Sequence, residues 1–94
     1  MKFSCDLPID FDDNTVEFST NEAIMKMAQA MEKAGFSATY VTDHPAPSSR
    51  WLAGGGHATL DPFVALSVAG AATRTLQLQT HILVLAYRNP FVVA

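Results

Sequence analysis

The chain has 94 residues, the size of one small domain, and 49% of them are apolar while 16% are charged, which favours a packed core over disorder. A net charge of −3 without a basic stripe argues against a nucleic-acid partner, and the single cysteine, Cys5, excludes an internal disulfide. The sequence has no uninterrupted apolar stretch of the roughly 18 residues that a membrane span needs. The apolar region near its start is too short for a secretory signal. These features predict a soluble, cytoplasmic protein without a membrane partner.

The sequence begins with the pattern of a short strand followed by an acidic loop. Apolar residues alternate over Lys2–Leu7, which places Phe3, Cys5 and Leu7 on one face of the strand. The stretch Ile9–Thr15 is rich in aspartate but lacks the spacing and central glycine of a calcium-binding EF-hand loop. A solvated loop is therefore expected there.

The next stretch has the signals of an amphipathic helix. Ser19 as the cap, with Glu22 three residues later, has the spacing of a capping box. The helix is predicted to run to about residue 34, where Gly35 provides a left-handed stop. One apolar stripe at three- and four-residue spacing should face the core, and it consists of Ile24, Met27, Met31 and Ala34.

The second predicted strand, Ser37–Thr42, stops abruptly at Asp43, His44 and Pro45. Proline ends the strand because it has no N–H for a ladder and favours an extended backbone before it. In folds with parallel strands the carboxyl ends of the strands carry the chemistry. His44 is therefore a candidate proton-transfer residue, because an imidazole can give and take a proton near neutral pH. The alternative is a loop histidine without chemistry.

A long irregular loop, residues 45–60, follows and holds several further candidates. Trp51 is expected either to stack on a ring system or to anchor the loop against the fold. Arg50 could bind an anionic group through its two-pronged guanidinium, but a surface ion pair is favoured, with Asp43 as a candidate partner. Asp43 alternatively ties the loop. His57 is expected to be a solvated loop residue. A zinc site is not predicted, because ligand spacing is lacking among Asp43, His44, His57 and His81.

Two further elements follow, and a third begins. Asp61 and Pro62 are a cap and a first helical residue, and the helix they open is apolar almost all round to Ala72, which predicts burial on more than one side. Leu76–Leu85 is the third predicted strand, and its second half is apolar on both faces. Asn89-Pro90 repeats the cap-plus-proline helix start.

The predicted order is β-α-β-α-β followed by the start of a helix, which indicates α/β architecture with parallel strands. A capped helix without a body and two open strand edges suggest the N-terminal portion of a larger domain. A complete (β/α)8 TIM barrel needs roughly 250 residues, and this chain would be its truncated first third. Residues 1–94 are thus expected to form one N-terminal fragment of such a barrel.

Four motifs in this order resemble the bacterial luciferase-like monooxygenase family. Its deazaflavin (coenzyme F-420)-dependent oxidoreductase branch is the most similar, and the resemblance covers essentially the whole chain. The family has a (β/α)8 barrel that binds FMN or the deazaflavin at the carboxyl ends of its strands. The motifs are Val41-Thr42-Asp43-His44-Pro45, Arg50-Trp51-Leu52, Leu60-Asp61-Pro62-Phe63-Val64-Ala65-Leu66 and Ile82-Leu83-Val84-Leu85-Ala86-Tyr87-Arg88-Asn89-Pro90.

The resemblance implies roles for individual residues. His44 matches the family's catalytic acid or base beside the flavin-type ring, and Asp43 matches the acid next to it. The segment Thr80-His81-Ile82 matches a strand that contacts the cofactor, often through a non-proline cis peptide bond. This sequence departs from the family there, because Gln79 and His81 are bulky where small residues are common. For His81 the alternative is a strand histidine bonded to a neighbour.

Two functions from different classes are therefore expected. The first is an oxidoreductase that acts on a small-molecule substrate with coenzyme F-420, or alternatively FMN, as cofactor. The second is a non-catalytic association module that docks through its open sheet edge onto a partner, onto another copy of itself, or onto the missing C-terminal part of the barrel.

Overall fold

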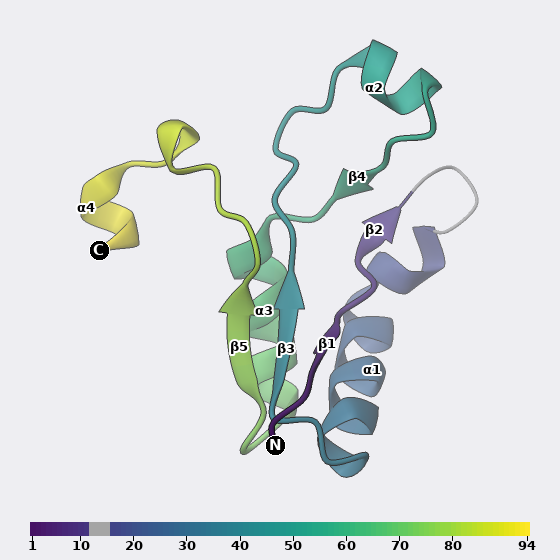
Figure 1. Cartoon of the computed structure of the whole chain (residues 1–94), viewed down its shortest axis with the longest axis vertical. Coiled ribbons are helices and arrows are strands. Elements are labelled where there is room, and N and C mark those ends of the chain that lie inside the picture. Colours follow the sequence, from purple (N-terminus) through teal and green to yellow (C-terminus); the bar gives the residue numbers. More distant parts are fainter. Residues whose placement is uncertain (12–15) are drawn as a thin grey trace.

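The computed structural model describes residues 1–11 and 16–94 and has a three-stranded parallel sheet at its centre (Figure 1). The strands are β1 (Ser4–Asp6), β3 (Ala38–Val41) and β5 (Gln77–Thr80), in the spatial order β1-β3-β5. Cys5 pairs with Thr39, and Thr39 pairs with Leu78, both in parallel register. The predicted α/β architecture with parallel strands is thus confirmed.

The remaining elements either connect these strands or lie beyond their carboxyl ends. Two of them, β2 and β4, form a separate antiparallel pair. Among the described residues, no helix is long and apolar enough to cross a membrane. The bounds are β2 (Asp10–Phe11), a 3-10 helix η1 (Val16–Ser19), α1 (Asn21–Lys33), α2 (Ser49–Ala53), β4 (Ala58–Thr59), α3 (Pro62–Ala72), a 3-10 helix η2 (Leu85–Tyr87) and α4 (Pro90–Val93).

Both predicted loops contain structure that the sequence did not indicate. Residues 10–11 of the predicted acidic loop form β2, and the rest of that loop, residues 12–15, lies outside the described residues. The predicted irregular stretch 45–60 contains α2, which Ser48 caps by accepting a hydrogen bond from the Trp51 N–H, and also β4. The local pattern missed β2 and β4 because these two segments are strands only through their pairing with each other.

Helix α1 begins one residue later than the capping-box pattern predicts. Ser19 is the last residue of η1, and its hydroxyl donates to the Val16 carbonyl. Thr20 has the extended backbone of a cap, and its hydroxyl oxygen accepts from the Ala23 N–H at 3.2 Å. Glu22 therefore forms an ion pair with a lysine one turn along the helix rather than the reciprocal half of a capping box. The predicted end is confirmed, because Gly35 has a φ of +87°.

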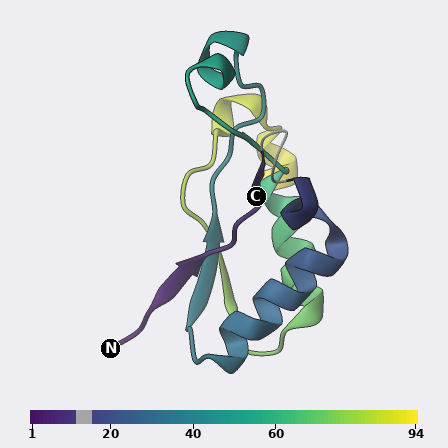
Figure 2. The same ribbon diagram turned by 90° about the vertical axis from the view of Figure 1, so that its right-hand side faces the viewer.

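The core lies between the sheet and the two long helices, which both pack on one face of it (Figure 2). The predicted stripe of α1 is confirmed at Ile24, Met27 and Met31, which are buried in the core or packed against it, whereas Ala34 is exposed and Ala28 is buried in its place. Helix α3 is buried along one side rather than on several, since Phe63 and Val64 are 41% and 59% exposed. The buried core residues are Leu7, Ile9, Ile24, Ala28, Val41, Ala65, Leu66, Ala69 and Leu76.

Strand β5 ends five residues before the sequence pattern predicts. The His81 N–H donates to the Val41 carbonyl, and the next backbone donor bonded to a neighbouring segment is the Val84 N–H, which bonds the Asp43 carboxylate instead. Ile82 and Leu85 are 60% and 63% exposed. The reason is that β3 leaves the sheet after Val41, so the apolar stretch 82–85 has no strand to pair with.

Glu32 ties the end of α1 to the segment that leads into β5. Its Oε1 accepts hydrogen bonds from the backbone N–H groups of Arg74, Thr75 and Leu76 and from the Thr75 hydroxyl. The N–H groups of Thr75 and Arg74, followed by the hydroxyl, lower the pKa of Glu32 from 4.5 to about 2. All of these donors favour the charged carboxylate.

This pKa predicts acid sensitivity with a definite sign. Because the folded pKa is lower than the unfolded one, the stabilisation by Glu32 is present above about pH 4.5 and is lost as the pH falls toward about 2. Urea unfolding of the wild type and Glu32→Gln should differ at neutral pH and converge in acid. The matched control is Glu22→Gln, on the exposed surface of the same helix. A pH-independent difference between wild type and Glu32→Gln would contradict the assignment.

Candidate functional site

The segments after β3 and β5 meet above the carboxyl ends of the parallel strands (Figure 1). Asp43 and His44 follow β3 directly, and because neighbouring side chains alternate along an extended backbone they point to different sides. Asp43 is 4% exposed, whereas His44 is half-buried. The sequence therefore places both residues at the end of the sheet where chemistry is expected, in two different environments.

Asp43 ties the segment after β5 to the end of β3. Its Oδ2 accepts from the Val84 N–H at 2.9 Å and from Arg88 Nη2 at 3.0 Å. Arg88 Nη1 also donates to Asp61 Oδ2 at 2.9 Å. Asp43 thus ties the segment after β5 rather than the loop 45–60, and Arg88 rather than the predicted Arg50 is its ionic partner.

Arg88 is held between two carboxylates and against an aromatic ring. Asp43, followed by Asp61, raises the pKa of Arg88 despite the opposing effect of burial. Burial alone would raise the pKa of Asp61, but Arg88 and the first N–H groups of α3 lower it below its ordinary value. The guanidinium carbon lies 4.9 Å from the centroid of the Phe63 ring. These contacts fix the segment that carries Tyr87 beside the end of β3.

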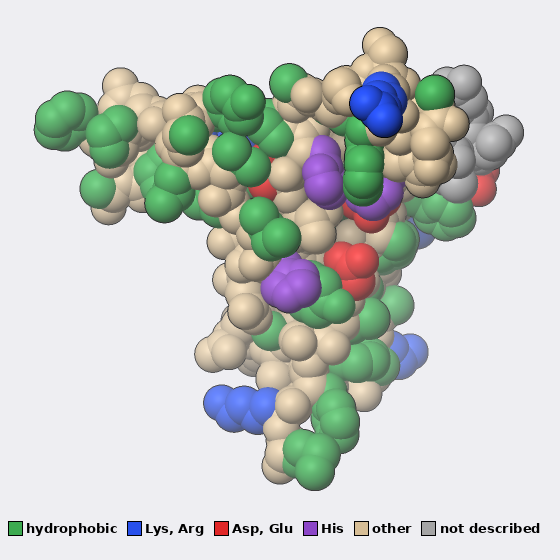
Figure 3. Space-filling view, turned by 45° about the horizontal axis from the view of Figure 1, so that its top comes forward, with side chains coloured by type: hydrophobic (Ala, Val, Ile, Leu, Met, Phe, Trp, Pro, Cys, Tyr) green, Lys and Arg blue, Asp and Glu red, His purple; other side chains and the backbone are tan. Residues whose placement is uncertain are grey.

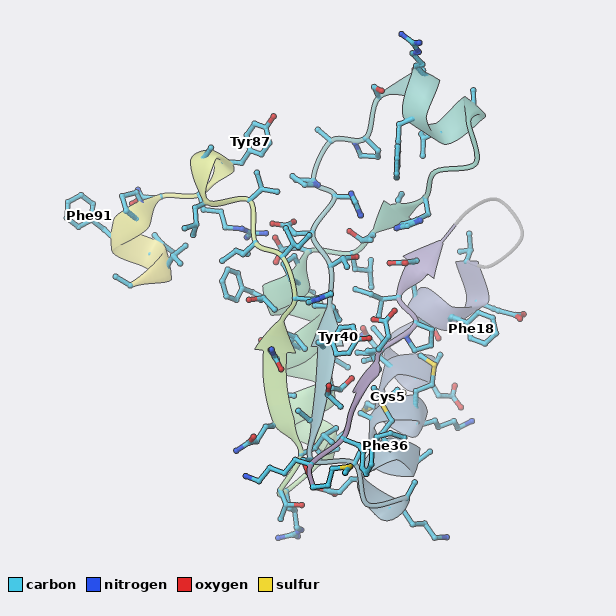
Figure 4. All side chains as sticks on the ribbon, in the orientation of Figure 1. Cys5, Phe18, Phe36, Tyr40, Tyr87 and Phe91 are labelled. Atoms are coloured by element: carbon cyan, nitrogen blue, oxygen red, sulfur yellow. The ribbon has the colours of Figure 1, made fainter. Side chains whose placement is uncertain are left out.

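A pocket of about 250 Å³ opens beside His44. Its wall is mostly apolar and includes two aromatic side chains, Trp51 of α2 and Tyr87 of η2. Tyr87 rises from η2, and Phe91 points outward from α4 (Figure 4). The volume is below the range typical of pockets that enclose whole ligands, so it suits one part of a ring system. The lining residues are Asp43, His44, Pro45, Ala46, Pro47, Trp51, Val84 and Tyr87.

His44 forms a cluster with two other rings, which also lie close to each other. Its centroid is 5.9 Å from that of Trp51, with the rings nearly parallel, and 4.9 Å from that of His57, with the rings edge-on. The backbone N–H of His44 donates to the Thr59 hydroxyl at 3.0 Å. The imidazole therefore lines the pocket in contact with two other rings, and the backbone at the start of its loop is hydrogen-bonded to β4.

Trp51 packs directly over a glycine. A Cβ on Gly56 would overlap the indole ring, so this position accepts no side chain while the ring stays in place. The indole Nε1–H also donates to the His57 carbonyl at 3.4 Å. Trp51 thus anchors the loop, which is one of its two predicted roles, and leaves 48% of its surface exposed beside the pocket. Stacking on a ring system stays a prediction.

His57 is not the solvated loop residue that the sequence suggests. It is half-buried, and its Nε2 lies 3.2 Å from Asp10 Oδ2 on strand β2. Histidine side chains lie beside acidic ones on this face of the molecule (Figure 3). No local sequence signal could have found this contact, because the pair is 47 positions apart in the sequence and the β2–β4 pairing brings the two residues together.

The three predicted cofactor contacts at the end of β5 are not among the residues that line the pocket. Thr80 is half-buried, whereas Ile82 is exposed. The His81 ring is 5.0 Å from the Tyr40 ring. Peptide bonds are trans throughout the described residues, including the bond between His81 and Ile82, where the family often has a cis bond.

Comparisons with known proteins identify the family. A family model described as luciferase-like monooxygenase matches residues 1–94. Comparison with curated proteins finds no match, and comparison with solved structures finds none either. Within residues 1–11 and 16–94, no three side chains of histidine, cysteine, aspartate or glutamate are grouped so that they could hold a metal ion. The match spans the full chain, which therefore belongs to the luciferase-like monooxygenase family.

Proposed function

We propose that this chain contributes the proton-transfer side of an oxidoreductase site that binds a flavin-type ring. By the likeness of its motifs the ring is the deazaflavin coenzyme F-420, with FMN as the alternative. The observation that carries the proposal is the position of His44, which follows β3 at the carboxyl end of the sheet and lines a pocket between aromatic rings. The family match supports an oxidoreductase reaction on a small-molecule substrate.

The arrangement of the sheet supports a barrel sector. The strands follow one another in space in their chain order, and α1 and α3 cover the same face (Figure 2). A doubly wound sheet has helices on both faces, whereas a (β/α)8 barrel has them on one side only, outside its ring of strands. In this proposal the uncovered face of the sheet corresponds to the interior of a barrel.

The lining of the pocket fits part of a flat ring. Pro47, Trp51 and Tyr87 offer apolar and aromatic surface, on which a planar ligand can stack. Asp43 and His44 are two acid–base groups near the proposed position of the cofactor ring, and they differ in whether they are free to exchange a proton. Arg88 and the Val84 N–H already engage the carboxylate of Asp43, which leaves the imidazole of His44 as the group that can exchange a proton with a ligand.

The chemistry divides between the cofactor and the chain. When bound, the deazaflavin supplies hydride transfer, and reduced FMN supplies oxygen activation. His44 gives a proton to the substrate or accepts one from it, and Trp51 with Pro47 excludes water on one side of the imidazole. Thr80, His81 and Ile82 follow the neighbouring strand β5, and we propose that they border the ring from the uncovered sheet face.

Titration of the purified chain with FMN and with coenzyme F-420 tests the proposal. We expect saturable binding by absorbance and fluorescence, and its loss in His44→Ala. The matched variant His44→Gln keeps a polar side chain of similar reach but cannot carry a proton near neutral pH, so it should retain binding. Binding that is unchanged in His44→Ala would contradict the role of His44.

A second function, association, is favoured by the surface around α4. Phe91 and Val92 are 94% and 81% exposed, and Tyr87 is 74% exposed. Within the described residues, β1 and β5 each pair with a strand on one side only. Unpaired edges and exposed apolar side chains are typical of surfaces that join another chain. In the titration above, absent cofactor binding together with a concentration-dependent oligomer in light scattering would favour this function.

A further inference from the structure

We infer that His57, held by Asp10, is a positioning residue that fixes the His44 imidazole relative to Trp51. The inference rests on the proposed function, because it assigns His57 a part in the site where His44 exchanges a proton. It concerns a side chain that lies in none of the family-like motifs of the sequence.

The first support is that His57 contacts both residues that form this side of the pocket. Its ring is edge-on to His44, with centroids 4.9 Å apart, and lies 6.2 Å from the Trp51 ring at a steep angle. Its carbonyl accepts the indole N–H of Trp51. Removal of the His57 ring should therefore affect the positions of both the His44 imidazole and the Trp51 indole.

The second support is that His57 is itself held from a different part of the chain. Asp10 Oδ2 lies 3.2 Å from the His57 Nε2 atom, which is enclosed by protein and has no aligned hydrogen bond within the described residues. The contact is thus a close approach of imidazole and carboxylate rather than an aligned hydrogen bond. The two side chains are 36% and 37% exposed, so the pair contributes more to orientation than to stability.

The third support is that the backbone around this pair is fixed. Asp10 is the register partner of Thr59, two residues after His57. The Thr59 hydroxyl accepts the backbone N–H of His44. One short strand pair therefore sets the positions of Asp10, His57 and the start of the His44 loop. The Asp10–His57 pair is therefore connected to His44 through the backbone of the same strand pair.

Proton NMR of the whole chain without cofactor tests the inference. In the wild type we expect ring-to-ring cross-peaks between His44 and His57 and between His44 and Trp51. The inference predicts loss of the His44–Trp51 cross-peak in His57→Ala and its weakening in Asp10→Asn. His57→Gln, whose amide can donate a hydrogen bond to Asp10, should restore it. The matched control His81→Ala removes an imidazole that contacts Tyr40 instead and should change neither cross-peak.

A second readout uses Trp51, the sole tryptophan of the chain. Its emission should shift to longer wavelength in His57→Ala and return toward the wild-type position in His57→Gln. Wild-type cross-peaks and emission in both His57→Ala and Asp10→Asn would overturn the inference. If His57→Ala loses the dispersed spectrum of a folded chain, Asp10→Asn decides by the same criteria. Because no cofactor is present, absence of cofactor binding would contradict the proposed function and leave this result unaffected.

Discussion

Asp43→Ala should destabilise the chain by about 3 kcal/mol, because it removes two hydrogen bonds to a buried carboxylate, and one of these is the ion pair with Arg88. For a domain of this size, such a loss lowers the melting temperature by more than about 10 °C. The Asp43 side chain is 2% exposed, so water cannot replace these contacts in the folded state. Thermal unfolding by circular dichroism measures the effect.

The matched control is Arg50→Ala. Arg50 is the partner that the sequence suggested for Asp43, but it is exposed on α2, and its removal should change stability by less than about 0.5 kcal/mol. Asp43→Asn keeps the shape of the side chain and should lie between wild type and Asp43→Ala. Equal destabilisation by Arg50→Ala and Asp43→Ala would show that Arg88 is not the ionic partner.

Gly56→Val should open the pocket beside His44, because a side chain at this position overlaps the indole of Trp51. The ring must then leave its place, and its emission should shift to longer wavelength. If the proposed function holds, affinity for the flavin-type ring should fall by about tenfold, which corresponds to the loss of one aromatic stacking contact. Fluorescence titration with coenzyme F-420 and FMN measures this change.

Gly54→Ala is the control for that substitution. A Cβ at Gly54 would lie 3.4 Å from the Arg50 carbonyl and 3.5 Å from the Trp51 carbonyl, which the loop can accept with little movement. The Trp51 emission and the affinity should stay close to those of the wild type. Similar effects of both substitutions would mean that loop backbone freedom, rather than the place of the indole, controls the pocket.

Local sequence signals predicted the elements whose ends depend on near neighbours. Asp61-Pro62 begins α3 and Asn89-Pro90 begins α4 as expected, since each cap accepts the N–H groups of its own first turn. Gly35 ends the first helix by its own backbone conformation. The same signals failed by one residue at Ser19, where the preceding 3-10 helix engages the hydroxyl.

The position of His44 could also be predicted, because a strand that stops at a proline determines which residues lie at its end. The side chains that surround His44 could not be predicted. Arg88 meets Asp43 across 45 residues, and Asp10 meets His57 through a strand pair too short for any periodic pattern. The third strand was predicted too long because its apolar residues cannot reveal where β3 leaves the sheet.

The sequence by itself determined the order of the three central strands and the two long helices and the histidine at the end of β3, because helix caps, helix stops and strand ends depend on contacts within a few residues. The parallel direction of β1, β3 and β5 followed from the helices that connect them. Only the tertiary structure decided which side chains surround that histidine. Ion pairs and ring contacts between distant segments depend on how the loops fold back above the sheet, and no local pattern records that path.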